Sequence, residues 1–149
     1  MCFVACRDDQ QDAVFLSADI DISVKSVEGI DLLNPLNPES FDEDQIIIYH
    51  LINGVFEEFY ESNLDHPKGF SIFEHNSQYR IRISSIPLGG IEEGTTLVEW
   101  NETDSDTLKY TIDRRNNGSY VSISKVWFND KEVWDQQTDN DERHFEIVK

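Results

Sequence analysis

The side chains that could carry acid–base or metal chemistry are spread along the whole chain. No two histidines have the His-x-x-x-His or His-Glu-x-x-His spacing that places two imidazoles on one face of a helix. No Gly-x-Ser-x-Gly turn exposes a serine nucleophile, and no glycine-rich loop is present to hold a phosphate. The sequence therefore predicts a protein that is not an enzyme and holds no metal or cofactor. The four histidines are His50, His66, His75 and His144.

Acidic residues are the most abundant chemical groups. A glycosidase needs two carboxylates held across a cleft, one with its pKa raised by burial, whereas most carboxylates here fall on predicted solvent faces or loops. Some could offer oxygen ligands to Ca²⁺, but no Asp-x-Asp-x-Asp-Gly loop is present, so solvated charges are favoured. These carboxylates are Asp19, Asp21, Asp104, Asp106, Asp139, Asp141 and Glu142.

The charge balance limits the partners. With 12 Lys and Arg against 30 Asp and Glu, the formal charge is -18. Such a surface repels phosphate backbones and anionic lipids, so direct nucleic-acid binding is disfavoured. It serves solubility, or it attracts cations or a basic protein.

Three tryptophans are candidates for a ligand platform. Trp100, Trp127 and Trp134, with Tyr60 and Tyr120, could form a flat surface on which a sugar ring stacks. Trp134 is the expected exposed member, because it ends a short predicted strand before a polar loop. The alternative is that these rings pack in the core.

The first residues resemble a lipidation signal. The apolar run Met1–Cys6 changes at Arg7 to a polar, acidic run, and Phe3-Val4-Ala5-Cys6 resembles the lipobox of bacterial lipoproteins. This resemblance implies a lipid anchor to the membrane at Cys6, with residues 1–12 as start and acidic tether. The alternative is a frayed terminus with two incidental thiols, Cys2 and Cys6.

Three further segments resemble small secreted lipoproteins of Bacteroides-type bacteria. Residues 27–35 read Val-Glu-Gly-Ile-Asp-Leu-Leu-Asn-Pro, and residues 104–108 and 126–131 are similar to two other recurrent segments of those proteins. The resemblance implies a bacterial cell-envelope location and a β-sandwich. It implies no reaction, because most of those proteins are of unknown function. Asp130 stands where a hairpin glycine is expected. Asp106-Thr107-Leu108 also resembles their O-glycosylation acceptor, which makes Thr107 a candidate glycosylation site.

Period-two alternation of apolar and polar residues predicts the strands. Residues 14–24 form one half-buried strand, and 46–52 and 55–60 form a hairpin around Asn53-Gly54. In 120–128 the alternation changes parity, which predicts a bulge near Ser124 and Lys125. Residues 40–45 allow one capped helical turn. The other predicted strands are 70–74, 79–84, 95–100, 107–113, 131–134 and 143–148.

These elements build one domain. At 149 residues and 38% hydrophobic content, residues 13–149 suit a single all-β domain, an antiparallel β-sandwich of about eight to ten short strands. We expect an immunoglobulin-like or transthyretin-like arrangement. No apolar run approaches the roughly 20 residues of a membrane-spanning helix.

The sequence thus favours a non-catalytic envelope lipoprotein domain with a binding or structural role, toward a glycan or protein ligand. One alternative is an acidic cytosolic inhibitor that neutralises a basic protein partner. The other is a carbohydrate-binding module.

Overall fold

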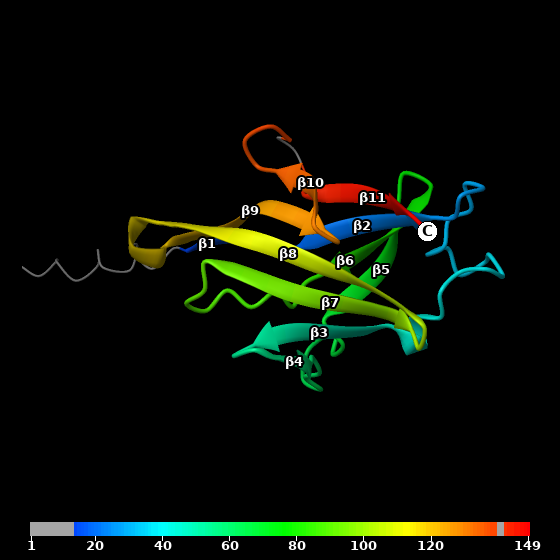
Figure 1. The fold of residues 1–149 in the computed structure, drawn as a ribbon, viewed down its shortest axis with the longest axis horizontal. Helices are drawn as coiled ribbons and strands as arrows, with labels where there is room; N and C mark the ends of the chain where they lie inside the picture. The colour runs from blue at the N-terminus through cyan, green and yellow to red at the C-terminus, as the bar shows by residue number, and fades with distance from the viewer. Residues whose placement is uncertain (1–13, 140–141) are drawn as a thin grey trace, which may run out of the picture.

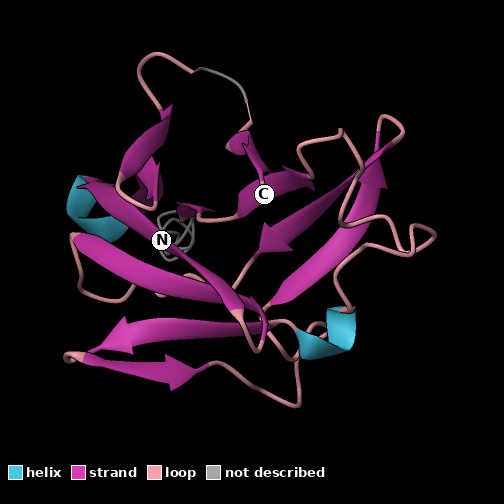
Figure 2. Ribbon diagram, turned by 45° about the vertical axis from the view of Figure 1, so that its right-hand side comes forward, coloured by secondary structure: helices cyan, strands magenta, loops and turns pink. Residues whose placement is uncertain are grey.

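The computed structural model describes residues 14–139 and 142–149. The candidate lipidation site Cys6 and the predicted tether over residues 1–12 lie outside these described residues. The described chain is an all-β sandwich of two packed sheets (Figures 1 and 2). None of its described helical segments is long and apolar enough to cross a membrane.

The elements follow the predicted order with small shifts at their ends. The strands are β1 (Phe15–Ser17), β2 (Ile20–Lys25), β3 (Ile47–Ile52), β4 (Val55–Glu58), β5 (Phe70–His75), β6 (Gln78–Ile83), β7 (Glu93–Asn101), β8 (Asp104–Arg115), β9 (Tyr120–Phe128), β10 (Lys131–Asp135) and β11 (His144–Val148). Two short 3₁₀ turns are η2 (Glu43–Gln45) and η3 (Asn116–Gly118). The Asp42 carboxylate caps η2 by accepting from the Asp44 N–H at 2.9 Å, within the predicted helical turn.

The seven-stranded sheet has the order β1-β9-β8-β7-β3-β4, and β10 also pairs with β9. The four-stranded sheet has the order β11-β2-β6-β5. Two pairs are parallel, β1 with β9 and β2 with β11, so the predicted all-β sandwich is confirmed, but its sheets are mixed rather than antiparallel throughout. Alternation within a strand cannot reveal the direction of its neighbour, because both directions bury the same rows of side chains. The finer immunoglobulin-like or transthyretin-like topology stays a prediction.

The single strand predicted over residues 14–24 is also wrong, and its division raises the strand number to eleven in the described residues. β1 joins the seven-stranded sheet and β2 the four-stranded one. Leu16 in β1 is 61% exposed, whereas Asp21 and Ser23 in β2 are buried although they occupy the expected solvent positions. The outer face of β2 is thus covered by long side chains of its neighbours.

Tight turns with positive φ angles connect β3 to β4 and β9 to β10. Asn53 and Gly54 between β3 and β4 have φ of 51° and 83°, as a type I′ turn requires. Asn129 and Asp130 adopt φ of 49° and 70° between β9 and β10. Asp130 therefore takes the place of the expected hairpin glycine, and its carboxylate pairs with Lys109 Nζ at 3.0 Å.

The predicted bulge in β9 is confirmed at Ser124. Lys125 pairs with Thr111 of β8 and Ile123 with Ile112, so Ser124 is the extra residue between them. The bulge lets Ile123 and Val126 both reach the core, where they are fully buried. It also places Lys125 and Trp127, which follow the bulge, on the outer face of the sheet.

A chain of polar side chains crosses the interior between the sheets. His50 Nδ1 lies 2.8 Å from Thr96 Oγ1, which lies 2.9 Å from the Tyr110 hydroxyl, and His50 Nε2 lies 2.9 Å from Ser85 Oγ. Burial lowers the pKa of His50 to about 4, so its ring is neutral at pH 7. A Cβ at Gly94 would lie 2.5 Å from the Tyr110 ring, so this close approach requires glycine.

Candidate functional site

The structure separates the three tryptophans of the predicted platform. Trp100 is 0% exposed and Trp134 is 4% exposed, so neither presents a ring to a ligand. Trp134, the expected exposed member, donates from Nε1 to the Glu142 carbonyl at 3.1 Å and has the Arg143 guanidinium 4.8 Å from its ring. The three-tryptophan platform is therefore wrong, and of the three only Trp127 is partly exposed.

Trp127 lies on the outer face of the seven-stranded sheet, within rows of side chains that cross four neighbouring strands. Cross-strand pairing places one residue from each of β7, β8, β9 and β10 in each row. The first row holds Thr95, Lys109, Trp127 and Glu132, and the second holds Glu93, Thr111, Lys125 and Asp135.

Two adjoining hollows follow these rows. The first has a volume of about 490 Å³ and is lined by Trp127, Thr95, Lys109, Thr111 and Asp130, together with residues of β7. The second has a volume of about 700 Å³ and shares Thr111 with the first. It is lined further by Asp113, Arg115, Tyr120, Lys125, Asp135 and Gln136. We call the two hollows together the β8 groove.

The β8 groove extends along most of its central strand. Lys109 lies opposite Trp127 and Arg115 lies opposite Tyr120. These two positions are six residues apart, which corresponds to roughly 20 Å of extended strand. A groove of that length suits a linear ligand of several units better than a single small molecule.

The cationic side chains that line the β8 groove are each paired with a carboxylate, and Arg115 lies 2.7 Å from Asp113. Lys109 lies 3.0 Å from Asp130, and Lys125 Nζ lies 3.4 Å from Asp135. Each ammonium has three donors and each carboxylate about four acceptor positions, so both pairs keep free hydrogen-bonding capacity. The groove thus combines nearly balanced charge with many donors and acceptors.

Two aromatic rings mark the two hollows, and they differ in what already contacts them. Phe15 stacks on the Tyr120 ring with centroids 5.0 Å apart, and the Arg115 guanidinium lies 4.7 Å from the same ring. The Tyr120 hydroxyl accepts from Gln136 Nε2 at 3.1 Å. Among the ring–ring and cation–ring contacts of the described residues, Trp127 makes one, with Lys125 Nζ at 5.7 Å from its centroid. Trp127 is therefore the aromatic surface of the groove that a ligand can stack on.

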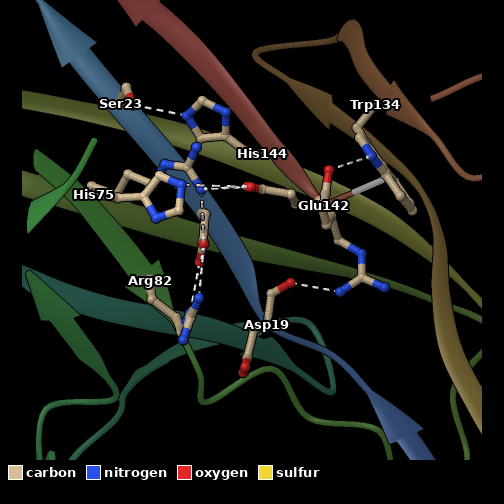
Figure 3. A network of polar contacts seen from close by, with 10 residues as sticks. Asp19, Ser23, His75, Arg82, Trp134, Glu142 and His144 are labelled. Atoms are coloured by element: carbon tan, nitrogen blue, oxygen red, sulfur yellow. Dashed lines mark hydrogen bonds and ion pairs between the residues drawn. The ribbon is translucent and has the colours of Figure 1, made fainter. Parts of the chain in front are cut away.

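The outer face of the four-stranded sheet carries a different polar arrangement, the Asp21 network (Figure 3). Asp21 accepts from Arg82 through both oxygens, at 2.8 and 3.0 Å, and lies 3.7 Å from Arg80. Arg80 also donates to Glu142 at 2.6 Å. This bond lowers the pKa of Glu142, although partial burial opposes the shift. The network joins β2, β6 and the segment that precedes β11.

Two histidines border the Asp21 network. His144 Nε2 lies 2.8 Å from the Ser23 hydroxyl, and His75 Nε2 lies 3.9 Å from a Glu142 oxygen (Figure 3). Burial lowers the pKa of His144, and the nearby Arg80 cation lowers it further. Ser23 is completely buried, so this hydroxyl–imidazole pair has no access to a substrate. We interpret the network as structural.

Four of the seven candidate calcium ligands, Asp21, Asp104, Asp106 and Glu142, are engaged by cations instead. Lys149 forms ion pairs with Asp104, at 2.8 Å, and with Asp106. Asp106 also accepts from Trp100 Nε1 and from Asn129 Nδ2, both at 2.7 Å. Burial alone would raise the pKa of Asp106, but these three donors lower it. Asp141 lies outside the described residues, and within the described ranges no three potential ligands gather into a metal site.

The candidate glycosylation residue, Thr107, lies inside β8. Its N–H donates to the Asn129 side chain at 2.8 Å, and its carbonyl accepts from the Asn129 N–H at 2.8 Å. The residue is half-buried on the outer face, opposite Leu97. The glycosylation of Thr107 stays a prediction.

The Ser85–His50 contact has the distance of a nucleophile–base pair. Thr96, rather than a carboxylate, contacts His50 Nδ1. A hydroxyl stabilises an imidazolium less than the aspartate of a Ser-His-Asp triad does. The contact therefore reads as part of the buried polar chain between the sheets.

No protein-family model, curated protein or solved structure matches this chain. The resemblance to Bacteroides-type lipoproteins stays a prediction.

Sequence reasoning missed most of the β8 groove. Its signal is the row of outward residues at alternate positions of β8, which includes Lys109 and Thr111. Combined with the bulge at Ser124, this row places Trp127 beside Lys109 and on the same face. Trp100 lies on the inward face of β7, together with the buried residues Thr96 and Val98.

Proposed function

We propose that this domain is a non-catalytic binding module that holds a carbohydrate chain in the β8 groove. One observation carries the proposal: Trp127 is partly exposed beside paired charges and threonines that line a hollow. A sugar ring has an apolar face of C–H groups that stacks on an indole, and hydroxyls at its rim that need donors and acceptors. Thr95, Lys109 and Asp130 supply those groups next to the ring.

The charge pattern favours a neutral or weakly charged glycan. Lys109, Lys125 and Arg115 each have a carboxylate partner in the groove, so none of these three cations is left without one to hold a phosphate or a densely sulfated chain. The overall charge of -18 repels such polyanions as well. A neutral polysaccharide meets no such repulsion.

Binding to immobilised neutral and charged oligosaccharides tests the proposal. We expect a subset of neutral glycans to bind, to quench the tryptophan fluorescence, and to lose at least about tenfold in affinity in Trp127→Ala. Phe56→Ala is the matched control, because it removes an exposed aromatic ring from the same sheet outside the groove. A silent array, or equal binding by Trp127→Ala and wild type, would refute the assignment.

We further propose that a lipid on Cys6 tethers this module to the bacterial cell envelope. The lipobox-like Phe3-Val4-Ala5-Cys6 and the acidic run that follows it support this location. Metabolic labelling of the full-length chain with a palmitate analogue should mark wild type and Cys2→Ala but not Cys6→Ala. An unlabelled wild type, or a labelled Cys6→Ala, would contradict the tether.

A further inference from the structure

The β4 edge of the seven-stranded sheet is open to solvent. In the described part of the chain β4 pairs only with β3. Figures 1 and 2 show β4 as the outermost strand on its side of the molecule, with no other strand beyond it. All four of its residues are exposed. An open edge of this kind is a template on which another strand can pair.

The backbone groups available at this edge follow from the hairpin register. Phe59 N–H donates to the Ile48 carbonyl at 2.8 Å, and Ile52 pairs with Val55 next to the turn. Hydrogen-bonded and non-hydrogen-bonded pairs alternate in an antiparallel ladder. Val55, Glu57 and Phe59 therefore bond to β3, while the N–H and C=O groups of Phe56 and Glu58 face away from it.

Large apolar side chains surround these free backbone groups. Val55 is 60% exposed and Phe56 is 43% exposed, and Leu51, the partner of Phe56 on β3, is also exposed. Tyr60 and Leu64 in the loop after β4 add two more exposed apolar side chains. Edge strands that are protected against pairing place charges or proline at such positions. Here the first half of β4 is apolar.

The charge around β4 selects its occupant. Between Leu51 and Pro67 the chain has four carboxylates and neither Lys nor Arg. All four side chains belong to exposed residues, namely Glu57, Glu58, Glu61 and Asp65. A second copy of this chain would bring the same carboxylates and a charge of -18 to the edge, so like charges disfavour self-pairing.

We propose that β4 accepts an extended, basic segment of a partner protein as an additional strand. The added strand bonds to the Phe56 and Glu58 backbones, with apolar side chains opposite Val55 and Phe56. Its Lys or Arg side chains lie opposite Glu57 and Glu58, because cross-strand neighbours of opposite charge stabilise pairing. This surface is separate from the β8 groove and does not depend on glycan binding.

The probe is a short peptide in which pairs of valines alternate with pairs of lysines. We expect it to bind the full chain and to slow hydrogen exchange at the Phe56 and Glu58 amides, while the same peptide with glutamates for lysines does not bind. Glu57→Lys/Glu58→Lys should weaken binding about tenfold. The matched control, Glu28→Lys/Glu39→Lys, makes the same charge change in the exposed loop before β3 and should bind nearly as wild type.

A proline at Phe56 tests the backbone contacts. Phe56→Pro removes an N–H that faces away from β3, so the hairpin keeps its own bonds while strand addition is blocked. Phe56→Ala retains that N–H and should retain most of the affinity. If Phe56→Pro does not fold, the charge-reversal pair decides. Three outcomes would overturn the proposal: protection of other amides, equal weakening by both charge reversals, or a homodimer through β4. Trp127→Ala should bind the peptide normally.

Discussion

The outer faces of the two sheets use charged residues in opposite ways. On the four-stranded sheet, Asp21 is 5% exposed and its partners Arg80 and Arg82 close over it. On the seven-stranded sheet, the Lys109–Asp130 pair is half-exposed or more at both ends and borders an open hollow. Removing one partner of a covered pair leaves a buried charge without compensation, whereas exposed pairs contribute little stability and keep capacity for a ligand.

This difference separates residues that hold the structure from residues available for binding. The Asp21 network connects β2 to β6 and to Glu142, and so fixes the segment leading into β11. The β8 groove lies on strands already held by β7 and β9 ladders. Its side chains can therefore change without loss of the fold.

Asp21→Ala should produce the largest loss of stability. The substitution removes the β2 partner of Arg80, which is largely buried. Removing one member of a buried ion pair costs about 3 kcal/mol. Chemical denaturation measures the loss, and glycan binding by the folded fraction should be unchanged. A loss below about 1 kcal/mol would place the Asp21 network with ordinary surface pairs.

The pH dependence of stability should show that His50 is buried without charge. The pKa of His50 is lowered to about 4 from 6.5, so the unfolded chain binds more protons between these values and stability falls as pH decreases. The wild type should lose about 3 kcal/mol relative to His50→Gln between pH 6.5 and 4. His66→Gln, at an exposed loop position, should follow the wild-type curve, and a His50→Gln curve parallel to wild type would contradict the prediction.

Lys149→Met tests the contact between the end of β11 and β8. Lys149 pairs with Asp104 and Asp106, and its pKa is raised because these hydrogen bonds outweigh partial burial. Loss of these charged hydrogen bonds should lower the free energy of unfolding by about 2 kcal/mol. Lys131→Met, at an exposed end of β10, is the matched control and should leave the melting temperature unchanged.

Lys109→Ala should have the smallest effect on stability. The exposed Lys109–Asp130 pair contributes less than about 1 kcal/mol, but its loss should weaken glycan binding in the β8 groove. Thermal melting and affinity are measured on the same protein. A large loss of stability with unchanged affinity would reverse the roles assigned to the two faces.

Much of the fold could be predicted because its signals are local. The Asn53-Gly54 turn specifies its hairpin through positive φ, and the change of parity between Ile123 and Val126 predicted the bulge at Ser124. The candidate site could not be predicted in the same way. Trp100, Trp127 and Trp134 look alike in sequence, and their burial depends on which strands cover each face.

The alternation of apolar and polar residues, together with the turn residues, determined that the described chain forms strands and where most of them lie. Only the tertiary structure decided that Phe15 pairs with Tyr120 and that Asp21 lies beside His144, both in parallel. These partners are about a hundred residues or more apart, and a strand's alternation is equally compatible with any neighbour. The burial of Asp21 follows from long-range pairing, because the neighbouring strand β6 supplies the arginine side chains that cover it.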